Sequence, residues 1–276
     1  MTPRILRTRG MVLFVFVIAL EGAVFSLHLG DKLILHPHVG PLEAPGARRI
    51  AIANGSDVIE AWEASSTEER PRLYVLRFYG NADRAEHHVA NDAAMLAPAG
   101  ALLWGVNYPG FGGSTGPASL RGAADSGLVA YDAIAQHAGG APIVVWGTSI
   151  GTTVALHVAA ERRVSAAVLQ DAPPLPQLIR GTQGLWNAWL LALPVSLQIP
   201  SSLNSIKNAH RSSAPALFVT SGADEIVPPR YQTLVYDAYA GNKSRATIDF
   251  AYHCGALTTS VQARVRELIA ASAERP

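Results

Sequence analysis

From Ala51 onward, short apolar or β-branched runs alternate with longer stretches of helical pattern. This alternation is typical of a mostly parallel central sheet with helices on both faces, and it predicts an α/β fold. Strands are expected at residues 49–53, 58–64, 73–78, 102–107, 143–147, 166–169, 216–220 and 246–250. Helices are expected at residues 84–96, 119–136, 152–160, 230–238 and 258–271. The 276-residue chain is long enough for one such domain.

Residues 172–206 interrupt the alternation. The stretch "APPLPQLIRGTQGLWNAWLLALPVSLQIPSSLNSI" mixes Pro, Trp and Leu without a strand pattern. It predicts a short cap-like insertion after the sixth strand, over the carboxyl edge of the sheet. The cluster around Trp186 and Trp189 has three readings: contact with an acyl or lipid-like substrate, docking on a bilayer, or core packing.

The first 30 residues differ in kind from the domain expected at residues 31–276. Arg4, Arg7 and Arg9 precede an apolar run from Met11 to Leu27, which approaches the ~17 residues of a short membrane-spanning helix. No good small-x-small cleavage site follows, so we expect an uncleaved membrane anchor with the domain on the non-cytoplasmic side. The alternative is a cleaved signal peptide that leaves the domain secreted or periplasmic.

Charge and cysteine content exclude several classes of function. Charged residues make up 16% of the chain, the net charge is +1 and no basic block is present, so nucleic acid is not an expected partner. Cys254 is the single cysteine, which excludes an internal disulfide and a Cys-rich metal site. The oligomeric state is not predicted.

One serine stands between two glycines in "PIVVWGTSIGTTVAL", which begins at Pro142. If an apolar strand ends at Gly147 and a helix begins near Thr152, Ser149 occupies a tight strand-to-helix turn. The glycines remove side chains that would collide there, and the turn lifts the serine hydroxyl above the sheet edge. The stretch lacks the Gly-Lys-Ser/Thr ending of a phosphate loop, so it predicts a nucleophile.

A serine nucleophile needs a base and an acid that orients it, and the later chain supplies both in order. "ALFVTSGADEIVPP" puts Asp224 on the loop after a late strand, and "ATIDFAYHCGAL" puts His253 after the last strand. Asp171, at the end of an earlier strand, Asp249, inside one, and Glu225 are the alternative acids.

The tetrahedral intermediate of acyl transfer also needs N–H donors. One is expected from the backbone of Ile150, after the nucleophile, and one from Asn81, on the loop that follows the third strand. Tyr79 begins this loop, and Tyr108 lies on a second glycine-rich loop, "NYPGFGGSTGPAS", which misses the dinucleotide-binding spacing. We expect Tyr79, Tyr108, Trp186 and Trp189 to line the substrate site.

Taken in chain order, "FYGNA", "NYPGFGGSTGPAS", "WGTSIGTTVAL", "SGADEIVPP" and "YHCGAL" resemble the motifs of α/β-hydrolase-fold serine hydrolases. The resemblance is to the membrane-anchored branch with a His-Gly-Asn oxyanion motif, which includes lysophospholipid and monoacylglycerol lipases and protein depalmitoylases. It implies a catalytic triad of Ser149, Asp224 and His253, with backbone donors at Asn81 and Ile150. Two departures are Tyr79 in place of the usual His, and Cys-Gly after His253.

The function expected from this resemblance is cleavage of a carboxylic ester or thioester, with a lipid-like or acyl substrate, through an acyl-enzyme. No metal or cofactor is needed for this chemistry. The alternatives on the same fold are a serine aminopeptidase, an acyltransferase, and a catalytically inactive membrane-tethered binding scaffold.

Overall fold

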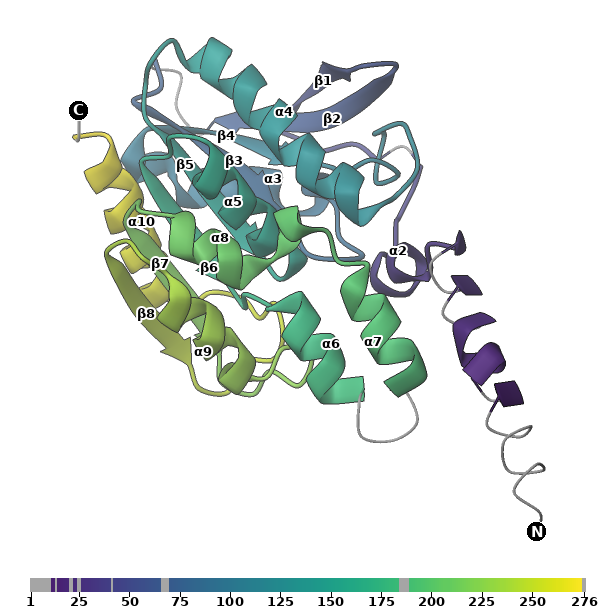
Figure 1. The fold of residues 1–276 in the computed structure, drawn as a ribbon. Helices are drawn as coiled ribbons and strands as arrows, with labels where there is room; N and C mark the ends of the chain where they lie inside the picture. Colours follow the sequence, from purple (N-terminus) through teal and green to yellow (C-terminus); the bar gives the residue numbers. More distant parts are fainter. Residues whose placement is uncertain are drawn as a thin grey trace, which may run out of the picture.

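The computed structural model describes residues 11–12, 14–19, 22–23, 26–40, 42–65, 70–183 and 189–274. Its centre is an eight-stranded sheet with the strand order β1-β2-β4-β3-β5-β6-β7-β8 (Figure 1). The pairs β1–β2 and β2–β4 are antiparallel and all later pairs are parallel. The strands are β1 (Arg48–Asn54), β2 (Asp57–Ser65), β3 (Leu73–Phe78), β4 (Ala101–Val106), β5 (Ile143–Thr148), β6 (Ala166–Gln170), β7 (Ala216–Ser221) and β8 (Lys243–Ile248).

Helices cover the sheet on both faces. One core joins the sheet to α4 (Leu120–Ala138), α5 (Ile150–Glu161), α8 (Ser205–Arg211) and α9 (Pro229–Ala238). A second core joins the other face to α3 (Val89–Met95) and α10 (Thr259–Ser272). Short 3₁₀ turns lie at Ala85–His87, Ala97–Ala99 and Ser201–Leu203. The predicted α/β class and mostly parallel sheet are therefore confirmed.

The central strands are buried on both faces, which explains why their sequences are apolar runs instead of alternating patterns. Every residue of β3, β4, β5, β6 and β7 is buried, as expected for parallel strands covered by helices on both sides. The edge strand β8 buries only Ala246. Because most of its residues are at least partly exposed and several are polar, the sequence pattern placed this strand too late, at residues 246–250. The strand ends at Ile248, so Asp249 lies beyond it.

The insertion after β6 contains two helices, α6 (Leu175–Gln183) and α7 (Trp189–Leu197), which lie side by side beyond the carboxyl edge of the sheet (Figure 1). Trp186 lies outside the described residues, and of Trp189 only the backbone position at the start of α7 is described. Their expected contacts with substrate therefore stay predictions.

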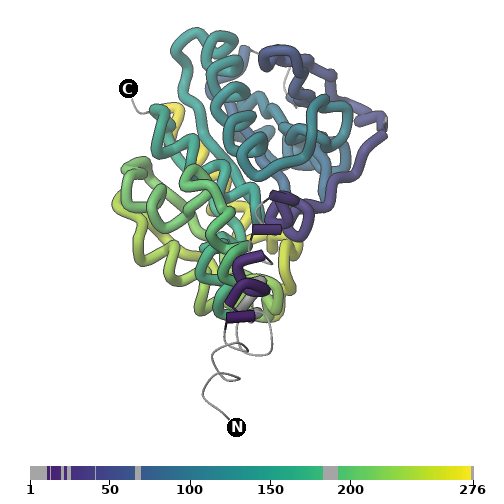
Figure 2. Tube along the Cα trace, turned by 45° about the vertical axis from the view of Figure 1, so that its right-hand side comes forward, coloured from purple at the N-terminus to yellow at the C-terminus, as the bar shows by residue number. Residues whose placement is uncertain are grey.

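The chain before β1 contains a short helix, α2 (Leu29–Ile34), that the sequence pattern did not predict. It lies beside α7 (Figure 1). In Figure 2 the same segment is purple and the insertion is green. Much of the predicted membrane segment, including residues 1–10, falls outside the described residues. Within the described ranges, no helix combines the length and apolar character needed to cross a membrane.

Candidate active site

Ser149 lies in the turn between β5 and α5, with backbone angles φ 53° and ψ −125°. A positive φ is unfavourable for a residue with a side chain, so the surroundings must impose it. The surroundings are close: a Cβ on Gly147 would lie 2.5 Å from the carbonyl oxygen of Gly151, and a Cβ on Gly151 would collide with that of Phe78. Only glycine fits at either position, as the sequence motif predicts.

The side chains of Ser149, His253 and Asp224 form a continuous hydrogen-bonded row. His253 Nε2 lies 2.7 Å from Ser149 Oγ, and His253 Nδ1 lies 2.7 Å from Asp224 Oδ2. The three residues come from the loops after β5, β8 and β7, which all end at the same edge of the sheet. The structure thus brings together the three residues predicted from the sequence. Serine, imidazole and carboxylate follow one another in the order that nucleophilic catalysis by serine requires.

Asp224 is buried and firmly held. Its Oδ1 accepts hydrogen bonds from the backbone N–H groups of Ile226 and Val227, and its Oδ2 accepts one from the Gln232 amide at 3.1 Å as well as facing His253. Such contacts fix the carboxylate and thereby the orientation of the imidazole. Burial lowers the pKa of His253, but the hydrogen bond to the Asp224 carboxylate, together with the neighbouring Cys254 side chain, raises that pKa above 6.5 overall.

An apolar pocket of about 290 Å³ opens at Ser149. Ser149 and His253 line it, together with Asn81, Ile150 and Cys254. Within the part of the chain that the structure describes, the N–H groups of Asn81 and Ile150 have no hydrogen-bond acceptor. The apolar walls come from α2, from the start of the insertion and from the loop after β7, and are formed by Ile34, Pro173, Leu175, Leu178, Ile226 and Val227.

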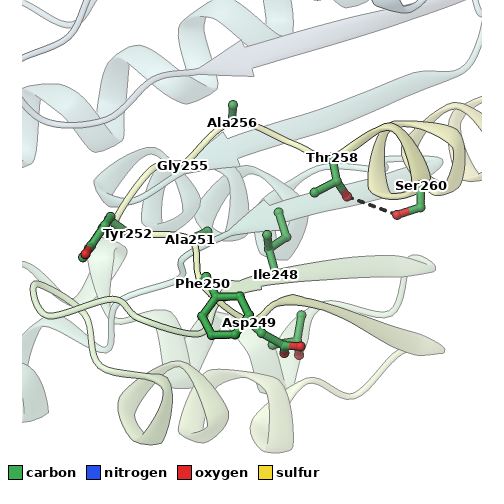
Figure 3. A pocket seen from close by; sticks show the side chains of 10 residues that line it. Ile248, Asp249, Phe250, Ala251, Tyr252, Gly255, Ala256, Thr258 and Ser260 are labelled. Atoms are coloured by element: carbon green, nitrogen blue, oxygen red, sulfur yellow. Dashed lines mark hydrogen bonds between the residues drawn. The ribbon is translucent and has the colours of Figure 1, made fainter.

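A larger hollow, of about 590 Å³, lies along the loop between β8 and α10. Figure 3 shows its lining, with Ile248, Phe250 and Ala251 on one side and Thr258 and Ser260 on the other. None of the three hydrogen-bonded residues lines it. The candidate reaction site is therefore the smaller apolar pocket, because only that pocket contains the serine and the imidazole.

The structure does not bring Tyr79 and Tyr108 to this pocket. Tyr79 is buried, its hydroxyl donates to Asp92, and its ring stacks on His88 with the ring centroids 5.4 Å apart. Tyr108 is also buried and its hydroxyl donates to the Tyr79 carbonyl at 2.9 Å. Both side chains therefore brace the loops around the site and do not line this pocket, because a residue's place on a loop does not fix the direction of its side chain.

Asp171, one of the alternative acids, has a different position. It is fully buried with φ 53°, and it accepts hydrogen bonds from the Ser221 N–H, the Ser221 hydroxyl and the Cys254 N–H. Burial raises the pKa of its carboxyl even though these groups donate to it. Asp171 thus fastens the residue next to His253 to the end of β7, a role that its position at the end of β6 alone did not indicate.

Two groups in the described residues bring three possible metal ligands within 4.8 Å of one another. In the first, Asp83 already pairs with His87 at 3.1 Å and with His88 at 2.7 Å. In the second, made of Asp171, His253 and Cys254, the imidazole and the carboxylate are both occupied by the hydrogen bonds described above. In both groups, the hydrogen bonds and ion pairs described here already engage possible ligand atoms.

Replacing Asp171 by Ala is expected to destabilise the fold strongly. It would leave the N–H and hydroxyl of Ser221 and the N–H of Cys254 without an acceptor, at about 1–3 kcal/mol for each buried group. We expect urea unfolding to report a loss of about 3 kcal/mol or more. The exposed Asp237→Ala is the matched control and should change stability by less than about 0.5 kcal/mol. Equal stability of the two variants would refute the role given to Asp171.

The chain is similar to known proteins along most of its length. A family model described as "alpha/beta hydrolase fold" matches residues 85–201. Protein bem46 of Schizosaccharomyces pombe is 27% identical over 187 residues, which are 66% of this chain and 61% of that protein. Lysophosphatidylserine lipase ABHD12 of Danio rerio is 27% identical over 203 residues, 67% of this chain and 51% of that protein. The chain thus matches about half to three fifths of these two relatives' lengths.

Among solved structures, an esterase of Pyrococcus furiosus superposes with a TM-score of 0.66 at 16% identity, covering 86% of this chain and 97% of that protein. At this identity the likeness concerns the fold alone. The expected resemblance to α/β-hydrolases is thereby confirmed, whereas the specific His-Gly-Asn branch is not. The sheet order, the serine turn between β5 and α5 and these likenesses together identify the chain as a protein of the α/β-hydrolase fold.

Proposed function

We propose that this protein hydrolyses carboxylic esters of apolar acyl groups through an acyl-enzyme on Ser149. The observation that carries the proposal is the row of hydrogen bonds from Ser149 through His253 to Asp224, whose first two members line an apolar pocket. The name of one relative, a lysophosphatidylserine lipase, supports ester hydrolysis in general. A thioester would fit the same geometry, since the attacked carbonyl is equivalent.

In the proposed reaction, His253 Nε2 takes the proton of Ser149 as its oxygen attacks the ester carbonyl carbon. The negative oxygen of the tetrahedral intermediate accepts hydrogen bonds from the N–H groups of Asn81 and Ile150. The C–O bond to the alcohol then breaks, and His253 returns the proton to the departing alcohol. Water, activated by the same imidazole, attacks the acyl-serine, releasing the acid. Asp224 stays ionised throughout and stabilises the imidazolium.

The pocket lining favours an acyl group over the ammonium of a peptide N-terminus. Among the described residues no Asp or Glu lines the pocket, and its walls are aliphatic, whereas an aminopeptidase needs a carboxylate to hold the substrate ammonium. An acyltransferase would differ only in the acceptor of the acyl group. An N-terminal membrane anchor, with the domain on the non-cytoplasmic side, remains part of the proposal on the sequence evidence alone.

A fluorophosphonate probe is expected to modify Ser149 of the full-length protein, as peptide mass spectrometry would report. Labelling should be lost in Ser149→Ala and reduced at least about a hundredfold in His253→Ala, because the serine is then no longer deprotonated. Ser213 is exposed and does not line the pocket, so Ser213→Ala should label like the wild type. A folded wild-type protein that resists the probe would instead indicate a non-catalytic scaffold.

Lengthening the acyl chain of p-nitrophenyl esters is expected to raise kcat/KM until the pocket is full. Each buried methylene contributes about 0.8 kcal/mol, which corresponds to at most about a fourfold gain. Leu178 lines the pocket, so Leu178→Trp should remove most of the preference for an octanoyl over an acetyl ester. Leu234, on the surface of α9, is the control position for the same substitution. A flat chain-length profile in the wild type would argue against an apolar acyl substrate.

The pH dependence should reflect the raised pKa of His253. Only the neutral imidazole can accept the serine proton, so kcat/KM should rise with pH through a pKa above 6.5 and be higher at pH 9 than at pH 7. The Cys254 thiol helps to raise this pKa, so Cys254→Ala should move the rising limb to lower pH. Cys254→Ser keeps a hydrogen-bonding side chain at this position and should shift the limb less. Superimposable pH profiles for wild type and Cys254→Ala would contradict this account.

A further inference from the structure

We propose that residues 29–36, which we call the strap, form a working part of the active site, and that the Asn81 side chain is the positioning group that joins the strap to the oxyanion loop. This inference rests on the proposed function. The strap comprises α2 and the two residues after it. Its role is to hold the Asn81 backbone N–H in the direction that the developing oxyanion requires.

The contact between Asn81 and the strap uses both ends of the side-chain amide. Asn81 Nδ2 donates to the carbonyl oxygen of Ile34, and Asn81 Oδ1 accepts from the N–H of His36 at 2.9 Å. Oδ1 also accepts from the N–H of Ala82 at 3.1 Å. Because an amide donates through nitrogen and accepts through oxygen, the strap backbone matches one orientation of the Asn81 side chain and no other.

The strap is itself fixed at several points away from Asn81. Asp31 Oδ1 accepts a hydrogen bond from the N–H of Leu120, at the start of α4, at 2.8 Å. The N–H of Gly30 donates to Gln198 Oε1, just after α7, at 3.0 Å. Leu35 is 4% exposed and belongs to the core between the sheet and helices α4 and α5. The strap therefore connects rigid parts of the domain and of the insertion to the oxyanion loop.

The oxyanion loop needs such a support because it is irregular. It leaves β3 at Phe78, and Ala82 has φ 59°, an unfavourable value for a residue with a side chain. The Asn81 N–H makes no hydrogen bond within the described residues, so no secondary-structure contact fixes its direction. The two hydrogen bonds to the strap are the contacts that restrain residue 81 itself from outside the loop.

The strap also contributes to the wall of the pocket. Ile34, whose carbonyl receives the Asn81 amide, lines the apolar pocket together with Leu175 and Leu178 of α6. One short segment thus touches both the expected site of the acyl chain and the loop that binds the oxyanion. A loss of the tie between them should act on the transition state, since the oxyanion exists only there, and should leave the binding of the acyl chain nearly unchanged.

The test is Asn81→Ala in the full-length protein, assayed with a p-nitrophenyl ester that the wild type hydrolyses. The backbone N–H remains in this variant and only its restraint is lost. We expect kcat to fall at least about tenfold, which is less than the factor of about 10²–10³ found for removal of a whole oxyanion donor, while KM changes less than twofold. The fluorophosphonate labelling rate should fall in parallel with kcat. Asn91→Ala, on the exposed face of α3, is the matched control and should behave as wild type.

A second variant avoids any change in the oxyanion loop. Gln198→Ala removes the acceptor of the Gly30 N–H and should lower kcat in the same direction but by less, again with KM preserved. Asn81→Ala with kcat within twofold of wild type, or with its whole loss in KM, would overturn the inference and leave the proposed function standing. A folded wild-type protein that neither hydrolyses esters nor reacts with the probe would overturn the proposed function, and the role of the strap with it.

Discussion

The candidate site depends on the close packing of β5, α5 and the end of β3 around Ser149. Gly147 and Gly151 let backbone approach backbone at distances that no side chain would allow, and this closeness imposes the positive φ of the serine. The unfavourable conformation has a use: it brings the hydroxyl to His253, next to a pocket that Ile150 also lines. The surrounding sheet must be rigid to maintain it, and the fully buried central strands provide that rigidity.

The fold was largely predictable because its main signals are local. Apolar runs of strand length, separated by helical patterns, indicated all eight strands, and only β8 was displaced, since its exposed residues carry no apolar signal. The proximity of Ser149, Asp224 and His253 also had a simple basis. Each follows a strand, and parallel strands end at the same edge of the sheet. Their catalytic roles remain predictions, to which the geometry now gives distances.

The parts that sequence reasoning missed depend on contacts between distant segments. The roles of Asp171, which holds the loop after His253, and of Asn81, whose side chain reaches a segment 45 residues earlier in the chain, involve backbone partners. Backbone groups are the same at every residue, so no motif in the partner segment reveals the contact. The directions of the Tyr79 and Tyr108 side chains were unpredictable for a related reason: the groups that bind their hydroxyls lie in other elements of the chain.

The position of the strap has a consequence for any shortened form of the protein. The recognisable domain pattern begins only with β1, at Arg48, so a boundary chosen from the regular elements would discard residues 29–36. Such a fragment would retain the sheet and all three hydrogen-bonded residues, but it would lose one wall of the pocket and both external contacts of Asn81. A fragment that keeps the geometry of the pocket must therefore begin at or before Leu29, well ahead of the first strand.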